Sequence, residues 1–492
     1  MNDLSTTPLG GSNPDPARGA TRREHDLLGE AEVPANAYWG IHTLRAVKNF
    51  PITGVPVGHF PELVRALALV KLAAARANRR LGALSAEKAG AIERACMRIA
   101  EDDGLRDQFV VDVVQGGAGT STNMNANEVV ANVALEMLGR QKGDYAFLHP
   151  NDDVNKAQST NDAYPTALRL AVIFAAAPTI EALDELAYAC KAKAVEFADV
   201  IKIGRTQLQD AVPMTLGQEF DAYFATIKED VLRLKEAAAL FREINLGATA
   251  IGTGITSDAR YAALAVEELA RASRQPLVPA SNMIEATSDM GAFVLFSGVL
   301  KRVAVKLSKI ASDLRLLSSG PRAGFAEIRL PAVQAGSSIM PGKINPVIPE
   351  VVNQVAYLVI GMDLTVTMCA EGGQLQLNAF EPTIGYCLLS SLRHLTAAIT
   401  TLTTRCINGI EADRQRCRAL VDDSIGLVTA LGPTLGYETS SRIAKRALAE
   451  RRRVADIVIE EGLLTRTQLD ELLRIEAMTA PAQVKAASPE DA

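Results

Sequence analysis

The stretch LGQEFDAYFATIKEDVLRLKEAAALFREIN, residues 216–245, predicts one long helix. After Gly217 it contains neither glycine nor proline until Gly247, and its apolar residues recur with the helical period. Thr215 and Gln218 match the capping box that starts a helix. Helices average about eleven or twelve residues, so a run of this length indicates a rod in a helical bundle.

Helical periodicity recurs along the rest of the chain, whereas alternating strand patterns are rare and short. The alanine patches at 175–177 and 237–239 allow close approach on more than one side, so we expect the long helices to pack against other subunits as well. The predicted fold class is all-α, with a central bundle of long helices. The expected helices cover residues 63–80, 86–102 after a Ser85 cap, 165–203 with a kink or break at Pro178, 286–317, 347–361 and 386–407, with a compact helical piece near 424–475.

The composition excludes several classes of protein. The 492 residues carry 51 Lys and Arg against 57 Asp and Glu, a net charge of −6, which argues against nucleic-acid binding. The six cysteines are scattered singly, so we expect buried free thiols rather than disulfides or a zinc site. No secretory signal and no uncharged apolar run near the roughly 20 residues of a membrane span are visible, which predicts a cytoplasmic protein without a membrane partner. Residues 1–24 and 478–492 are expected to be disordered tails.

Polar residues gather in four breaks between the helices. The first, QGGAGTSTNMN at 115–125, combines glycines that allow close backbone approach with hydroxyls and amides that can bind an anion. It lacks the third glycine of a dinucleotide site, and a plain capped turn is the alternative. The second, NKAQSTND at 155–162, places small polar side chains at the positive end of a long helix, which suits a carboxylate. Ordinary N-capping is the alternative there.

The third and fourth breaks add further ligand candidates. In GRTQLQD at 204–210, Thr206 and Gln207 are the candidates, while Arg205 and Asp210 are expected to form a structural ion pair. In AGSSIMPGKINP at 335–346, the sequence predicts an N-cap at the asparagine and a helix start at the following proline. Five residues separate its glycines where a P-loop has four, which argues against phosphate binding. A glycine-hinged lid carrying serine and lysine is the prediction, and a plain surface loop is the alternative.

Other common catalytic arrangements are not supported. Of the five histidines only His149 lies near a break, so no Ser-His-Asp triad is indicated. No motif with the spacing of metal ligands is visible. What remains is a hydroxyl-rich anion pocket, which suits a small dicarboxylate and chemistry on a carbon next to a carboxylate.

The four breaks, in this order, resemble those of the fumarase/aspartase superfamily over about residues 26–473. GSSIMPGKINP at 336–346 is similar to its signature loop. Three features are closer to the aspartases than to class II fumarases: GIHTLRA at 40–46, PVIPEVVNQV at 346–355, and Gln207, where fumarases carry histidine and some aspartases glutamine. The stretch HPNDDVN at 149–155 resembles both groups.

The resemblance implies a three-domain subunit, whose boundaries we place at 25–157, 158–412 and 413–477. It also implies a homotetramer in which each active site is built from three subunits. The substrate would be a small dicarboxylate. No cofactor is implied, because the substrate carries its own electron sink, and activation by a divalent metal ion stays open.

The resemblance also implies the reaction and the residues that perform it. Ser337 matches the general base, which would remove a proton from C3 of L-aspartate, so that ammonia leaves C2 and fumarate forms. Gln207 replaces the family's histidine, so the pairing of that histidine with Glu350 is not carried over. A fumarate hydratase or other lyase of this fold, a non-catalytic structural relative and an unrelated helical enzyme are the alternatives. The matching binding residues are Thr120, Ser159, Thr160 and Ser338 for the β-carboxylate, Thr206, Lys343 and Asn345 for the α-carboxylate, and Asn161 and Gln207 for the amino group.

Overall fold

The computed structural model describes residues 19–336 and 338–480, and these are mostly helical, which confirms the predicted fold class. Ser337 and most of the two predicted tails lie outside the described residues. Contacts divide the chain into two compact units, while the predicted three-domain boundaries stay a prediction. The first unit comprises Met1–Ala177, Glu236–Gly298 and Gly361–Leu392, and the second comprises Pro178–Lys235, Val299–Ile360 and Arg393–Ala492.

Five long helices match the rods that the sequence predicts. The capping box is present, because Thr215 N–H donates to Gln218 Oε1 at 2.9 Å and Gln218 N–H donates to Thr215 Oγ1 at 3.1 Å. In the second unit, α6 and α9 are joined by Tyr223 and Asp313 at 3.2 Å. The long helices are α5 (Thr160–Glu196), α6 (Leu216–Ala239), α9 (Gly291–Leu317), α10 (Val347–Glu371) and α11 (Glu381–Arg405).

Several helix boundaries differ from the prediction: α9 begins at Gly291, α10 continues to Glu371 and α11 begins at Glu381. Helix α5 continues through Pro178, because burial of residues such as Ala176 and Leu183 outweighs the one hydrogen bond that proline removes. It ends at Glu196, and residues 201–203 belong to a strand instead. Helix α6 ends at Ala239, since a 3-10 turn at Leu240–Arg242 and a short strand follow.

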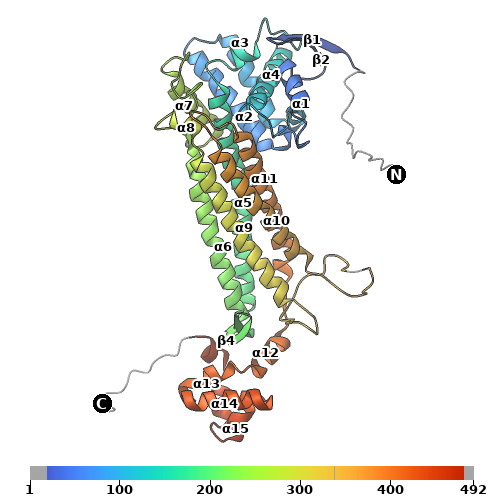
Figure 1. Cartoon of the computed structure of the whole chain (residues 1–492), viewed down its shortest axis with the longest axis vertical. Helices are drawn as coiled ribbons and strands as arrows, with labels where there is room; N and C mark the ends of the chain where they lie inside the picture. Colours follow the sequence, from blue (N-terminus) through green and yellow to red (C-terminus); the bar gives the residue numbers. More distant parts are fainter. Residues whose placement is uncertain (1–18, 337, 481–492) are drawn as a thin grey trace, which may run out of the picture. The chain divides into compact units, whose positions relative to one another are not determined.

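The first unit is centred on α2 (Pro61–Arg80), which packs against α3, α4 and α7 (Figure 1). The alanine, leucine and valine side chains of α2 are buried on nearly every side of the helix. Ser85 caps α3 as predicted, by accepting Lys88 N–H. The other elements are α1 (Ile41–Asn49), α3 (Ala86–Glu101), α4 (Thr120–Met137), α7 (Tyr261–Ser273), α8 (Glu285–Ser288), β1 (Thr21–Asp26), β2 (Gly29–Pro34), β5 (Glu243–Ile244), β6 (Val278–Pro279), 3-10 turns at Val57–His59 and Asp103–Gln108, and a π-helical turn at Pro150–Val154.

An antiparallel hairpin, β1–β2, occupies part of the predicted N-terminal tail. Residues 21–24, predicted as tail, pair with residues 31–34. The buried carboxylate of Glu24 accepts Ile41 N–H at 2.8 Å and pairs with Arg22 at 2.7 Å. Because the paired strand and Ile41 lie several positions further along the chain, local composition did not predict the strand.

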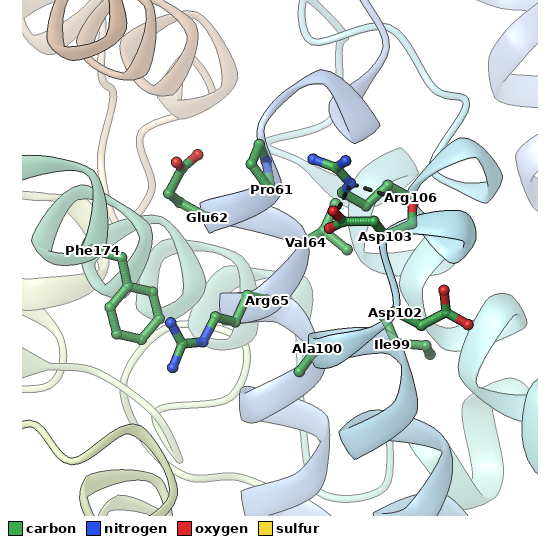
Figure 2. Close-up of a pocket in the computed structure, with 10 residues that line it drawn as sticks. All are labelled: Pro61, Glu62, Val64, Arg65, Ile99, Ala100, Asp102, Asp103, Arg106 and Phe174. Carbon is green, nitrogen blue, oxygen red and sulfur yellow. Dashed lines mark hydrogen bonds and ion pairs between the residues drawn. The ribbon is translucent and has the colours of Figure 1, made fainter. Parts of the chain in front are cut away.

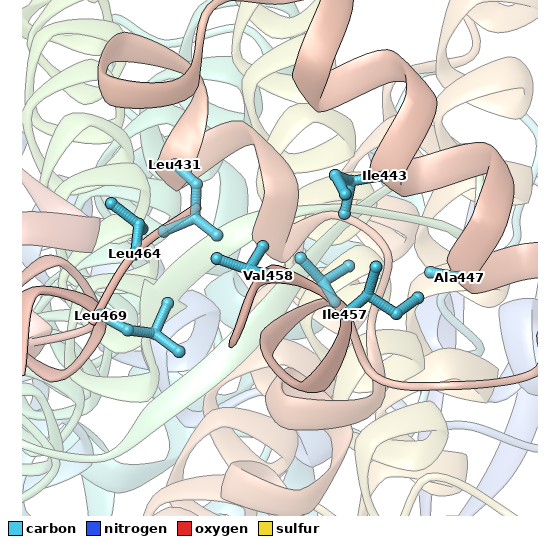
Figure 3. Packing of buried hydrophobic residues seen from close by; sticks show 8 residues of the cluster. Leu431, Ile443, Ala447, Ile457, Val458, Leu464 and Leu469 are labelled. Carbon is cyan, nitrogen blue, oxygen red and sulfur yellow. The ribbon is translucent and has the colours of Figure 1, made fainter. Parts of the chain in front are cut away.

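The second unit contains a hairpin and a group of short helices. Strands β3 (Ile201–Thr206) and β4 (Gln209–Thr215) form an antiparallel pair. The short helices share the apolar cluster drawn in Figure 3, in which Leu431, Ile443, Ile457 and Leu469 are buried. The remaining elements are α12 (Arg414–Asp423), α13 (Leu427–Leu435), α14 (Tyr437–Glu450), α15 (Val454–Glu460), α16 (Arg466–Leu472), α17 (Ile475–Thr479), β7 (Ile328–Arg329), β8 (Glu411–Ala412) and a 3-10 turn at Ile407–Gly409.

Helices α5 and α10 are long and apolar enough, by length and composition alone, to cross a membrane. The search of the sequence for uncharged apolar runs did not find α10, because charged residues such as Glu350 and Asp363 interrupt it. The apolar window of α5 is 67% buried, as in a core helix. That of α10 is only 33% buried, so α10 exposes Tyr357, Leu364 and Met368.

Candidate functional site

The first break is shaped by two glycines with a left-handed backbone. Gly117 and Gly119 have φ of +91° and +87°, in the left-handed region. A Cβ on Gly119 would lie 2.5 Å from Cγ of Tyr164. Thr120 follows at the start of α4 and is exposed, with its hydroxyl donating to the Gly117 carbonyl at 2.7 Å. That hydroxyl must rotate before it can donate to a substrate.

The second break forms the N-terminus of α5, where both the functional and the capping interpretations have support. Ser159 Oγ accepts Asn161 N–H at 3.2 Å, and Asp162 Oδ1 accepts Ser159 N–H at 2.9 Å. These are N-terminal capping contacts. The three predicted residues 159–161 are nevertheless partly exposed, so the positive end of α5 offers their donors to a ligand.

Lys71 joins the first two breaks, and the sequence analysis did not identify it. Its ammonium donates to Asn123 Oδ1 at 2.6 Å and to Asn155 Oδ1 and Gln158 Oε1 at 2.9 Å each. Asn123 Nδ2 donates in turn to Thr160 Oγ1 at 3.2 Å. Complete burial lowers the pKa of Lys71 to about 7, although the Asp162 carboxylate opposes this shift. The only sign of a buried charge in the sequence is the position of Lys71 inside an Ala/Leu-rich helix.

The third break is the turn of the β3–β4 hairpin. Gln207 and Leu208 occupy the turn with φ of 54° and 60°, and both Thr206 and Gln207 are exposed. Side chains at such a tip are free to meet a ligand.

The predicted ion pair between Arg205 and Asp210 is wrong. The two residues are cross-strand neighbours, but Arg205 pairs with Glu327 at 2.8 Å, and Asp210 accepts the Ser424 hydroxyl at 2.8 Å. Glu327 is fully buried and also pairs with Lys202 at 3.2 Å. A buried carboxylate needs such partners, so the hairpin that carries Thr206 is anchored through Glu327.

The fourth break is a loop whose two ends are joined. Asn345 Nδ2 donates to the Gly336 carbonyl at 2.7 Å, and a Cβ on Gly336 would lie 2.0 Å from the Lys343 carbonyl oxygen. Asn345 therefore joins the loop ends through its amide nitrogen, and α10 starts at Val347, one residue after the proline at which the sequence predicts the start. Ser338 and Lys343 are exposed on this loop. The candidate base, Ser337, lies outside the described residues.

The described candidates thus form two sets, each within one compact unit. The first unit holds Thr120 and residues 159–161, which Asn123 and Lys71 connect. The second unit holds Thr206, Gln207, Ser338, Lys343 and Asn345.

Other features of the described residues lie apart from these candidates. A cavity of about 260 Å³ is lined by residues such as Glu62, Arg65, Arg106 and Phe174, and no predicted site residue lines it (Figure 2). Among residues 19–336 and 338–480, no group of three or more His, Cys, Asp or Glu side chains is arranged to hold a metal ion. The six cysteines are free, and all except the partly exposed Cys369 are buried.

Comparisons with known proteins identify the family of the chain. Residues 29–361 match the family described as lyase, and residues 427–480 match that described as fumarase C C-terminus. The chain is 63% identical to an aspartate ammonia-lyase of Pseudomonas fluorescens, covering 94% of this chain and 96% of the relative. The enzyme of that name from Escherichia coli (strain K12) is 53% identical, with the same coverage.

Solved structures show the same relationship. A fumarate lyase:delta crystallin from Brucella melitensis, bound to cobalt, superposes with a TM-score of 0.92 at 60% identity and covers 94% of this chain and 100% of its own. A class II fumarase from Schistosoma mansoni gives 0.86 at 33% identity, covering 93% and 98%. The chain therefore belongs to the lyase family of the fumarase/aspartase superfamily, as its four loop segments predicted.

Proposed function

We propose that the chain is an aspartate ammonia-lyase, which eliminates ammonia from L-aspartate to give fumarate. Relatives with that name are 53% to 63% identical over 94% of the chain. The structural observation that carries the proposal is the N-terminus of α5, where partly exposed hydroxyl, amide and backbone N–H groups converge. This arrangement suits a carboxylate next to an amino group.

The β-carboxylate end is where the reaction needs most stabilisation. Removal of the weakly acidic C3 proton pushes charge onto this carboxylate and gives a doubly negative aci form. Preorganised donors stabilise that form more than the substrate, and removing one such donor typically costs about 3–4 kcal/mol. We assign this role to Thr120, Ser159, Thr160 and Ser338, and we assign the base to Ser337.

The other end of the substrate needs a cation and an acceptor for the ammonium. Lys343 is exposed on the loop, beside Asn345, whose amide joins the loop ends. With Thr206 these residues would bind the α-carboxylate, while Asn161 and Gln207 would hold the amino group. Closure of the loop would exclude water and strengthen every one of these contacts. The substrate supplies its own electron sink, so we propose that no organic cofactor takes part.

We further propose a homotetramer in which three subunits contribute to each site. The exposed apolar side chains of α10 support it, because Leu364 and Met368 are 64% and 60% exposed in the single chain. Leu364→Glu should therefore yield smaller species in light scattering. Leu448→Glu, at an equally exposed leucine on α14, should keep the size of the wild type. An unchanged mass for Leu364→Glu would contradict this interface.

The activity is tested by ultraviolet detection of fumarate from L-aspartate and from L-malate. We expect L-aspartate to be the substrate, and a preference for L-malate would instead identify a fumarate hydratase. Ser337→Ala should reduce kcat by orders of magnitude with an unchanged circular dichroism spectrum. If that variant keeps nearly full activity, Ser337 is not the base. No turnover of either compound would favour a non-catalytic relative.

A further inference from the structure

A buried carboxylate next to the candidate site connects two segments that are distant in the sequence. Asp162 is fully buried in the first turn of α5. Its Oδ1 accepts Ser159 N–H at 2.9 Å, and its Oδ2 accepts the N–H groups of Gly247 and Thr249 at 3.0 Å each. Asp162 therefore holds the turn at residues 245–250 against the N-terminus of α5.

This turn fixes the orientation of Asn161, a residue predicted to bind the substrate. Asn161 Nδ2 donates to the Ala250 carbonyl at 2.8 Å, and Asn245 Nδ2 donates to the Asn161 carbonyl at 3.0 Å. Because the amide nitrogen of Asn161 is engaged by the turn, its Oδ1 is left to act as an acceptor. An acceptor suits an ammonium group, which can only donate.

The turn has little freedom to move. Gly247 has φ of +97°, and a Cβ there would lie 2.5 Å from Cβ of Ala262. A Cβ on Gly252 would lie 2.4 Å from the backbone of Ile284. Because the turn is closely packed, the position of the Ala250 carbonyl is set by this packing together with the hydrogen bonds to Asp162.

We propose that Asp162 is a positioning residue that sets the preference of the site for an amino group. It acts by holding the turn whose Ala250 carbonyl orients the amide of Asn161. The inference rests on the proposed function, and it deepens it by naming what fixes the amine contact. Asp162 itself does not touch the substrate.

The ionised carboxylate is what this role requires. It accepts from three backbone N–H groups, whereas the amide of an asparagine would turn a donor toward some of them. Two of these N–H groups belong to the turn, so an isosteric Asp162→Asn substitution should loosen the turn and release the Asn161 amide. Asp162 also accepts Ser159 N–H, but the amide oxygen of an asparagine can keep that bond, so the carboxylate-binding end should change less than the amine end.

The test compares two ligands that share both carboxylates and differ in the amine. Titration calorimetry in a Ser337→Ala background gives equilibrium affinities for L-aspartate and for succinate without turnover. Asp162→Asn should weaken L-aspartate relative to succinate by about tenfold, the usual loss for one hydrogen bond to a charged group. A merely structural role would weaken both ligands equally. An unchanged ratio of the two dissociation constants would overturn the proposal.

Two further variants make the result specific. Asn161→Ala should change the ratio by a similar factor, and adding Asp162→Asn to it should change the ratio little further, because both act through one contact. Additive effects would contradict the proposed route. Asp258→Asn is the matched control, since Asp258 is an exposed carboxylate that follows the 245–250 turn in the sequence and pairs with Arg260. Its ratio should equal that of the wild type.

Failure of the Asp162→Asn variant to fold and failure of the proposed function can both be told apart from failure of this inference. If Asp162→Asn does not fold, Asp162→Ser leaves room for a water to accept the same N–H groups, and the same ratio applies. If the wild type neither binds nor converts L-aspartate, the proposed function fails. If it converts L-aspartate and the ratio does not respond to Asp162 or Asn161, only the present inference fails.

Discussion

Replacement of Lys71 by methionine should destabilise the protein strongly, although the two side chains have similar lengths. Lys71 is fully buried on α2, and its ammonium donates to three amide oxygens, those of Asn123, Asn155 and Gln158. Methionine would leave the Asn123 and Gln158 oxygens without this donor, whereas Asn155 Oδ1 still accepts the Asn123 amide at 3.2 Å. Asn123 also donates to Thr160, so the change would reach the candidate site.

The loss of stability follows from the hydrogen bonds that the Lys71 ammonium donates. Each buried acceptor left unsatisfied costs about 1–3 kcal/mol. Part of the sum is offset, because methionine does not require the desolvation of a cation. We therefore expect the free energy of unfolding to fall by about 2–4 kcal/mol, the sum for the two acceptors that lose their donor less this offset.

The pH dependence provides a second, independent signature. Burial lowers the pKa of Lys71 from 10.5 to about 7 in the folded protein. Between these values the unfolded chain binds more protons than the native one, so this group makes stability rise with pH. The rise should amount to about 2 kcal/mol between pH 7 and pH 9. Lys71→Met should lack this contribution.

Urea denaturation followed by circular dichroism, at pH 7 and pH 9, measures both quantities. Lys88→Met is the matched control, because Lys88 pairs with Asp153 at 2.7 Å but is partly exposed. Its cost should stay below about 1 kcal/mol. A cost for Lys71→Met no larger than that of the control, or a pH dependence equal to that of the wild type, would contradict this role of the buried ammonium.

Three further substitutions test the loops around the site. Gly119→Ala should cost about 3 kcal/mol in urea denaturation, because its Cβ would meet the Tyr164 ring, whereas Gly139→Ala, also at positive φ but with nothing within 4 Å, should cost about 1 kcal/mol; equal costs would argue against the clash. Lys343→Ala should raise KM for L-aspartate about tenfold with a smaller change in kcat, and an unchanged KM in the fumarate assay would exclude its carboxylate role. Glu327→Gln should lower stability by about 3–5 kcal/mol and speed hydrogen exchange in the β3–β4 hairpin, and an unaltered hairpin would show that it is anchored elsewhere.

The sequence was most informative about local structure. The long helices, the Ser85 cap and the Thr215 capping box depend on residues within a few positions of one another, so periodicity and cap residues were sufficient. The four breaks were predicted because glycines and small polar residues interrupt the apolar period.

Local patterns were misleading where a distant partner decided the outcome. Arg205 and Asp210 are close in sequence and opposite in charge, yet each has a partner more than a hundred positions away. Asn345 has the identity of an N-cap, but its amide joins the loop ends at Gly336. The partner of each of these three side chains lies beyond the few positions that the local pattern covers.

The helical architecture, the family and the residue types offered to a dicarboxylate were predictable, because they depend on short-range spacing. The buried charges that hold those residues in place could be recognised only in the folded chain. Lys71 lies 52 positions from Asn123, and Asp162 lies 85 from Gly247. A buried charge is stable only beside specific polar partners, and the folded chain alone brings such partners together.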